Sequence, residues 1–232
     1  MSRATPRVIL LLQATRGFDR GVLSGITRYA SLHGPWCFYR EQHAYFLPRR
    51  KTTVDELRAW KASGAVCPVS RFDLVRPLAI PIVGLDLNDY DGPVPGIVSD
   101  DVKLGRQAAE HLLGLGLERF AFCGLVGMRW SDERLKGFTD EISSAGRQVE
   151  MYKPPRKQRL TWVREEPAVK AWIKQLPKPI GIFCPNDDRS AYVLETCRSL
   201  GFGVPDDISV IGVDDDRYIC DLANPTLSSV AT

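Results

Sequence analysis

The sequence has no long hydrophobic run and no clustered metal-ligating residues. No stretch approaches the ~18 consecutive apolar residues of a membrane span. The N-terminal run ILLLQ is also too short for a signal peptide, so we expect a cytoplasmic protein without membrane contact. The six cysteines form no CxxC pair and the three histidines lie far apart. The thiols are therefore expected to be reduced and mostly buried, and no metal site is predicted.

Sequence signatures of common enzyme classes are also missing. Neither GxxxxGK[ST] nor GxSxG occurs, and the glycines at 114 and 116 follow a predicted helix without a third glycine, so no nucleotide site or nucleophile elbow is indicated. We predict no catalytic residue and no cofactor. The net charge of +3 is too small to indicate nucleic-acid binding. The short basic clusters at 49–51 and 153–159 are interpreted as solvated loops.

Apolar runs of strand length alternate with helical patterns along the whole chain. Leu104, Ala108 and Leu112, for example, recur at the spacing of one helix face. The predicted strands cover residues 8–13, 36–39, 65–69, 80–85, 96–99, 120–123, 150–152, 180–184 and 208–213. Repeated strand–helix units indicate parallel sheets with helices on both faces.

Two such cycles meet near residues 116–118. The chain is therefore predicted to be an α/β protein of two doubly wound parallel-sheet subdomains, residues 1–117 and 118–227. Residues 228–232 read as a strand and are expected to cross back toward the first subdomain.

Polar side chains follow most of these strands. The carboxyl ends of parallel strands share one edge of a sheet, where open α/β folds bind ligands. The candidate ligand-binding residues are Asp19, Arg20, Asp100, Trp130, Arg134, Asn186, Asp187 and Asp214. An indole face beside guanidinium donors suits a sugar, whose C–H face stacks and whose hydroxyls take hydrogen bonds. The pattern favours a small polyhydroxylated ligand.

Several of these acids have an alternative role as helix caps. Asp19 precedes a predicted helix, and one residue among Ser99, Asp100 and Asp101 is expected to cap the next one while another points inward. The acidic pair at 206–207 follows a proline and is interpreted as a turn or cap rather than a magnesium site.

Four segments together resemble the effector-binding domain of the LacI/GalR family, which shares its fold with periplasmic sugar-binding proteins (type I). They are SDDVKLGRQAAEHLLGLGLERFAFCG, SDERLKGF, PNDDRSAYVLETCRSLGFGVPDDISVIGVDDD and NPTLSSVAT. They cover most of the chain beyond residue 97. The opening LLQATRGFDRGVLSGITRYASLHGPW is similar, more narrowly, to xylose-operon regulators of the XylR type.

The resemblance implies ligand contacts at Asp100, Arg134, Asn186 or its neighbour Asp187, and Asp214. Arg134 stands three residues before Gly137, as the family pattern requires. Pro185 and the pair at 215–216 depart from that pattern.

The resemblance also implies the biological setting. We expect a sugar effector, xylose first among pentoses, a homodimer, and operator DNA bound through an AraC-type domain that follows residue 232. Two alternatives are a sugar-binding protein of transport, which would carry a signal peptide, and a sugar-modifying enzyme. The enzyme would need a nucleophile–base pair or a metal cluster.

Overall fold

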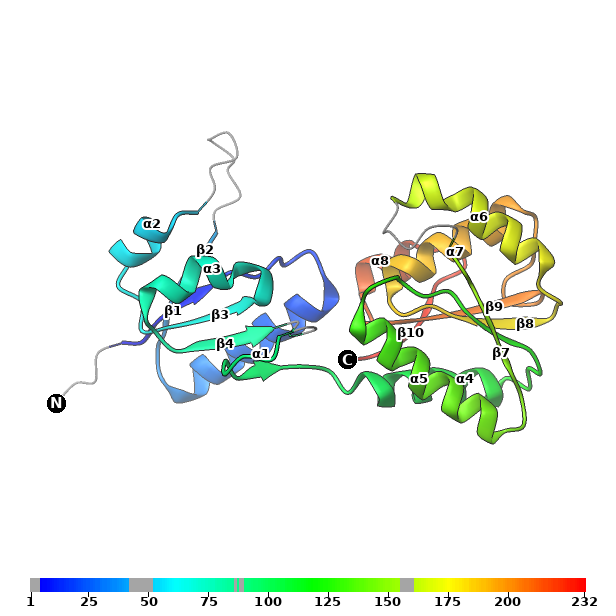
Figure 1. Cartoon of the computed structure of the whole chain (residues 1–232), viewed down its shortest axis with the longest axis horizontal. Coiled ribbons are helices and arrows are strands. Elements are labelled where there is room, and N and C mark those ends of the chain that lie inside the picture. The colour runs from blue at the N-terminus through cyan, green and yellow to red at the C-terminus, as the bar shows by residue number, and fades with distance from the viewer. Residues whose placement is uncertain (1–4, 42–51, 86, 88–89, 155–160) are drawn as a thin grey trace. The chain divides into compact units, whose positions relative to one another are not determined.

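The computed structural model describes residues 5–41, 52–85, 87, 90–154 and 161–232. The chain divides into two compact units, Met1–Val98 and Ser99–Thr232 (Figure 1). The basic cluster at 49–51 and the part of the second cluster from residue 155 onward lie outside the described residues.

The first unit is a five-stranded parallel sheet in the order β2-β1-β3-β4-β5. Its strands are β1 (Arg7–Leu10), β2 (Cys37–Arg40), β3 (Gly64–Pro68), β4 (Ile82–Leu85) and β5 (Gly96–Ile97). Its helices are α1 (Gly17–His33), α2 (Val54–Ala59) and α3 (Phe72–Val75), with 3-10 turns at Val69–Arg71 and Arg76–Leu78. Helix α2 begins with a capping box in which Thr53 Oγ1 accepts from the Glu56 amide and the Glu56 carboxylate accepts from the Thr53 amide.

The second unit is also a five-stranded parallel sheet, in the order β10-β9-β8-β6-β7. Its strands are β6 (Phe120–Phe122), β7 (Val149–Met151), β8 (Ile180–Phe183), β9 (Ile208–Val213) and β10 (Ser228–Val230). Its helices are α4 (Asp101–Gly114), α5 (Arg129–Ser144), α6 (Trp162–Gln175), α7 (Asp187–Ser199) and α8 (Arg217–Leu222).

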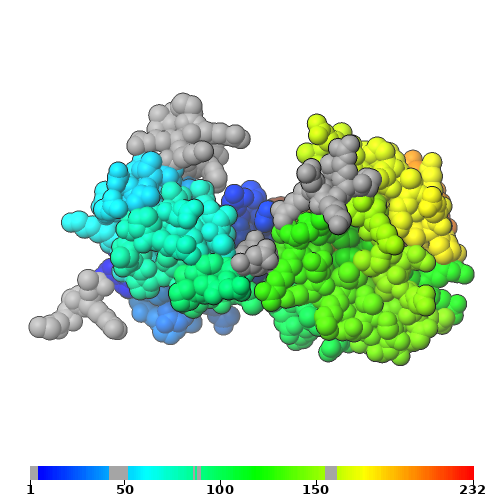
Figure 2. Space-filling view, viewed as in Figure 1, coloured from blue at the N-terminus to red at the C-terminus, as the bar shows by residue number. Residues whose placement is uncertain are grey.

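Helices cover both faces of the second sheet. Helices α4 and α5 lie on one face, and α6, α7 and α8 lie on the other (Figure 1). Successive side chains of β6 and the residue after it alternate accordingly: Phe120 and Phe122 pack toward α4 and α5, whereas Ala121 and Cys123 pack toward α6 and α7. Strands β8 and β9 are buried along their whole length, as a sheet covered on two faces requires. On the face shown in Figure 2 the surface of this unit is made by the green and yellow residues, which include those of helices α5 and α6.

Helices α4 and α5 touch through their backbones. A Cβ atom on Gly105 would overlap the carbonyl of Arg134, and a Cβ on Gly137 would overlap the carbonyl of Val102. Only glycine allows this approach at both positions. The contact fixes the start of α5 against the start of α4, which is where the polar residues described below meet.

The fold class predicted from the sequence is confirmed, since both units are parallel α/β sheets with helices on their faces. The compact units divide between residues 98 and 99, whereas the sequence predicts a boundary at 117. The observed boundary lies earlier because α4 packs against α5 within the second unit. Residues 228–230 were expected to cross toward the first subdomain. They form β10, which pairs with β9 in the second sheet, with Ser228 opposite Ile211. In the described part of the chain no helix is long and apolar enough to cross a membrane.

Candidate functional site

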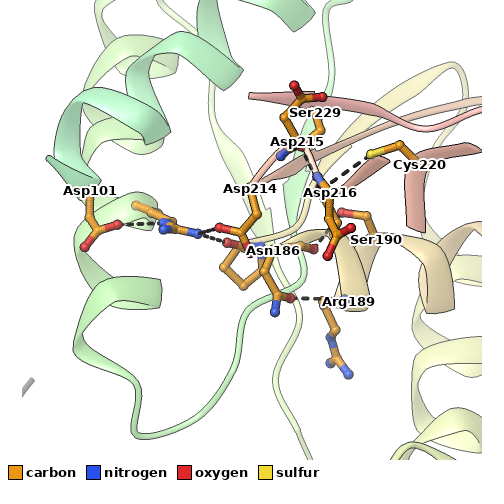
Figure 3. Close-up of polar contacts among 12 residues, drawn as sticks. Asp101, Asn186, Arg189, Ser190, Asp214, Asp215, Asp216, Cys220 and Ser229 are labelled. Carbon is orange, nitrogen blue, oxygen red and sulfur yellow. Dashed lines mark hydrogen bonds and ion pairs between the residues drawn. The ribbon is translucent and has the colours of Figure 1, made fainter. Parts of the chain in front are cut away.

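Arg134 is the centre of a polar cluster at the carboxyl edge of the second sheet. Figure 3 shows polar contacts at this edge, with Asp101, Asn186 and Asp214 labelled. Its side chain is buried, with 5% of its surface exposed. Its Nε donates to Asp101 Oδ1 at 2.7 Å, and its Nη1 donates to the Pro185 carbonyl and lies 3.6 Å from Asp214 Oδ1. The guanidinium carbon lies 5.0 Å from the centre of the Trp130 ring. The predicted pair of Trp130 and Arg134 therefore lies together on α5, and three other segments contact the guanidinium fork and fix its orientation.

The structure gives the two aspartates at the start of α4 different roles. Asp100, a predicted ligand contact, is the N-cap: its Oδ1 accepts from the Lys103 amide at 3.1 Å. Asp101 turns inward, is 7% exposed and pairs with Arg134. Burial raises the pKa of Asp101, and the neighbouring Arg134 cation works against that rise. The sequence had left open which of these acids caps the helix.

Asn186 and Asp187 also divide their roles. Asn186 caps α7, since its Oδ1 accepts from the Arg189 amide at 3.0 Å. Asp187 is 1% exposed and is held inside the unit. Its Oδ2 accepts from the Asp216 amide at 2.8 Å, and its Oδ1 accepts from Ser229 Oγ at 2.6 Å. Burial, chiefly, raises the pKa of Asp187 to about 6. This carboxylate ties α7 to the segment after β9 and to β10, so its oxygens are already engaged.

Asp214 follows β9 in an unusual backbone conformation, with φ +114°, and the next residue, Asp215, has φ +47°. Positive φ is costly for any residue other than glycine, and such strain persists where surrounding contacts hold it. Here the Asp214 amide donates to the Val230 carbonyl at 3.0 Å, and the Asp215 amide donates to Ser229 Oγ at 2.9 Å. The strained turn directs the Asp214 carboxylate to Arg134.

The Asp214 carboxylate remains 21% exposed, so solvent or a ligand can reach it. Its pKa is raised to about 7. Burial is the largest cause, the Arg134 cation lowers the pKa, and the carboxylates of Asp187, Asp188 and Asp216 raise it. Near neutral pH this group is poised between an acceptor-only carboxylate and a carboxylic acid that can also donate.

A second buried ion pair had no signal in the sequence. Arg189 of α7 donates to both carboxylate oxygens of Glu165 in α6, at 2.9 and 3.0 Å, and its Nε donates to the Cys123 carbonyl at 3.4 Å. The rings of Tyr152 and Trp162 lie 5.5 and 5.4 Å from the guanidinium. The pair joins two helices that are distant in sequence, and no local pattern identifies such partners.

Asp19 and Arg20 belong to the first unit and are described separately. They lie in the first turn of α1, whose N-cap is Arg16, so Asp19 is not the cap. Asp19 Oδ2 accepts from the Gln13 amide at 3.0 Å, and Arg20 Nη1 donates to the Ala14 carbonyl at 3.2 Å. Both side chains hold the loop between β1 and α1, and their role as ligand contacts stays a prediction.

The acidic pair at 206–207 lies in a turn: Asp207 Oδ2 accepts from the Gly203 amide at 2.7 Å. Among the described residues, no group of three or more histidine, cysteine or acidic side chains is arranged to hold a metal ion.

Two parallel α/β sheets, with a guanidinium and acids at the carboxyl edge of the second, are typical of periplasmic binding protein-like domains. Residues 109–232, more than half of the chain, match the periplasmic binding protein-like domain, and the chain belongs to that family. It is 28% identical over 236 residues to the xylose operon regulatory protein of Escherichia coli (strain K12), with 97% of this chain and 59% of that protein covered. The Haemophilus influenzae protein of the same name is 26% identical, with the same coverage.

Comparison with solved structures gives the same fold. The structure of the xylose-binding transcription activator xylR superimposes with a TM-score of 0.77 at 26% identity, covering 100% of this chain and 60% of that one. A complex of the transcriptional regulator CelR with cellobiose, at 20% identity, has the same fold, with a TM-score of 0.70 over 99% of this chain and 73% of that one. The expected resemblance to LacI/GalR-type effector domains is confirmed. The chain spans less than two thirds of the length of the xylose operon regulatory proteins that it matches.

Proposed function

We propose that the chain is the sugar-binding effector domain of a transcriptional regulator, and that its ligand is a pentose, with xylose as the first candidate. The observation that carries this proposal is the cluster at the carboxyl edge of the second sheet, where Arg134 is fixed beside the partly exposed Asp214 and the Trp130 ring. The similarity to xylose operon regulatory proteins supports the choice of sugar.

The chemistry of the cluster suits a polyol. Arg134 supplies a fixed donor fork, and Asp214 supplies acceptor oxygens to hydroxyl groups. Asn186 uses its oxygen as a helix cap, so its NH2 group is what it can offer to a ligand. Trp130 offers a ring face for the C–H side of a sugar ring. Asp187 then acts as a support that holds Asp216 and Ser229 behind the contact residues rather than as a contact itself.

The regulatory setting is part of the same proposal. An operator-binding domain after residue 232 and a homodimer would place this chain in the architecture that its XylR-type resemblance implies. A sugar can change the state of such a regulator only through a difference in its affinity for two conformations. The relatives reported above are regulators, which favours this role over a transport protein or an enzyme.

Calorimetric titration of the protein with xylose, arabinose, ribose and glucose tests the proposal. We expect heat with at least one pentose and a Kd between about 1 μM and 1 mM. Asp214→Asn should weaken that affinity by about tenfold to a hundredfold, since a hydrogen bond to a charged group contributes roughly 1.5–3 kcal/mol. The control is Asp140→Asn, which changes an exposed acid of α5 that pairs with Lys136. If no sugar produces heat or a thermal shift, the proposal fails.

A further inference from the structure

Two cysteines lie side by side where two paired strands end. Strands β6 and β8 pair in parallel with Phe122 opposite Phe183, and Cys123 and Cys184 are the next residues. The ladder continues through them, since the Cys123 amide donates to the Phe183 carbonyl at 3.0 Å. Both side chains belong to the core that faces α6 and α7, both are fully buried, and both are free thiols.

This placement is compatible with a bond between the two sulfurs. Neighbouring strands lie ~4.8 Å apart, and disulfides join residues whose Cα atoms are ~4.4–6.8 Å apart. Because Cys123 and Cys184 follow a registered pair and point to the same face, closing the bridge requires no change of register.

The surroundings make one of the two thiols unusual. The Arg189 guanidinium donates to the Cys123 carbonyl and stands beside the pair. Burial raises the pKa of Cys123, but hydrogen bonding with Cys184 and the Arg189 cation bring the pKa below its ordinary value, whereas burial keeps that of Cys184 well above it. Burial also raises the pKa of both Cys197 and Cys220 to about 12. The pair thus combines a thiolate-forming sulfur with an adjacent thiol, the arrangement that favours disulfide formation.

We propose that Cys123 and Cys184 form a redox-modification site that hydroperoxides convert to an intramolecular disulfide. The Cys123 sulfur attacks a peroxide oxygen: an S–O bond forms, the O–O bond breaks, and water or an alcohol leaves. The Cys184 sulfur then attacks the sulfenic acid: the S–S bond forms, the S–O bond breaks, and a second water leaves. Two thiols lose two electrons and the peroxide gains them. Both sulfurs are fully buried, so a local opening must precede the reaction.

The site lies directly before the segments that carry the candidate ligand contacts. Cys184 precedes Pro185, whose carbonyl accepts from Arg134, and Asn186 follows. Cys123 precedes the loop to α5, in which the Leu125 amide donates to Ser131 Oγ at 3.1 Å. We expect a bridge between the strand ends to shift these loops. We therefore expect oxidation to weaken sugar binding by about tenfold, the loss of one charged hydrogen bond. This consequence, unlike the modification itself, rests on the proposed function.

Peptide mapping of the protein after treatment with hydrogen peroxide tests the modification without any sugar. The protein is denatured, alkylated with N-ethylmaleimide and digested with trypsin, which separates Cys123 in peptide 120–129 from Cys184 in peptide 175–189. We expect those two peptides to be linked, and dithiothreitol to release them. The other cysteines, in peptides 29–40, 62–71, 190–198 and 218–232, should remain alkylated.

Variants add matched controls. Cys197→Ser should still form the bridge, and Cys123→Ser should leave Cys184 alkylated. Six alkylated cysteines after peroxide treatment, a link to any other cysteine, or oxidation of Cys123 without the bridge would each overturn the proposal. Because the wild-type map needs no variant, a misfolded Cys123→Ser protein does not remove the test.

If the bridge forms and xylose affinity is unchanged, the modification site holds and its link to binding is overturned. If the untreated protein binds no sugar, the proposed function is refuted, and the peptide map still decides whether the disulfide forms.

Discussion

Replacing Arg134 with alanine should destabilise the second unit strongly. The Arg134–Asp101 pair is short, at 2.7 Å, and both side chains are almost fully buried. Removing the arginine leaves the Asp101 carboxylate and the Pro185 carbonyl without their partner. Breaking a buried pair in this way costs about 3–5 kcal/mol of unfolding free energy. That is a large share of the ~5–15 kcal/mol available to a typical domain.

The penalty should depend on pH, and its sign follows from the raised pKa of Asp101. A carboxyl group whose pKa is higher in the folded than in the unfolded state supports folding at low pH, and the support is lost as pH rises through the folded value. Without Arg134, only burial and neighbouring acids act on Asp101, so its pKa rises further. The variant should therefore lose more stability at pH 8 than at pH 5. Asp101→Asn should remove most of this pH dependence in the Arg134→Ala background.

Urea titration followed by tryptophan fluorescence measures this cost. Trp36→Phe and Trp60→Phe remove the two tryptophans of the first unit, so the signal reports the second unit alone. Lys136→Ala is the matched control, because that exposed pair with Asp140 should contribute about 0–1 kcal/mol. A loss of less than about 1 kcal/mol for Arg134→Ala, equal at pH 5 and pH 8, would contradict the reasoning.

Three further predictions concern the same unit. Because the pKa of Asp214 is about 7 and its ionised form should bind hydroxyls, sugar affinity should fall about tenfold from pH 8 to pH 6, and Asp214→Asn should abolish that change in calorimetry. Gly105→Ala should cost about 1–3 kcal/mol or more in urea titration because its Cβ meets the backbone of α5, whereas Gly114→Ala, in open space on α4, should be neutral or stabilising; equal effects would contradict the contact. Asp187→Asn should cost about 1–3 kcal/mol at pH 8, since an amide accepts through only one oxygen; unchanged stability would show that the buried carboxylate is not a support.

The sequence by itself determined the kind of fold and the segments that carry the polar cluster. Apolar runs of strand length and helical spacing are local properties, so the alternation that defines a parallel α/β protein is visible without the structure. The short helices α3 and α8 were not predicted, although α2, also six residues long, was.

Tertiary structure decided which polar residue performs which role. Neighbouring positions on a helix point ~100° apart, so a difference of one residue separates the cap Asp100 from the buried Asp101, and the cap Asn186 from the buried Asp187. The Glu165–Arg189 pair forms between helices distant in the chain. Partners of this kind are brought together by sheet order and helix packing, and these depend on contacts that no local stretch of sequence contains.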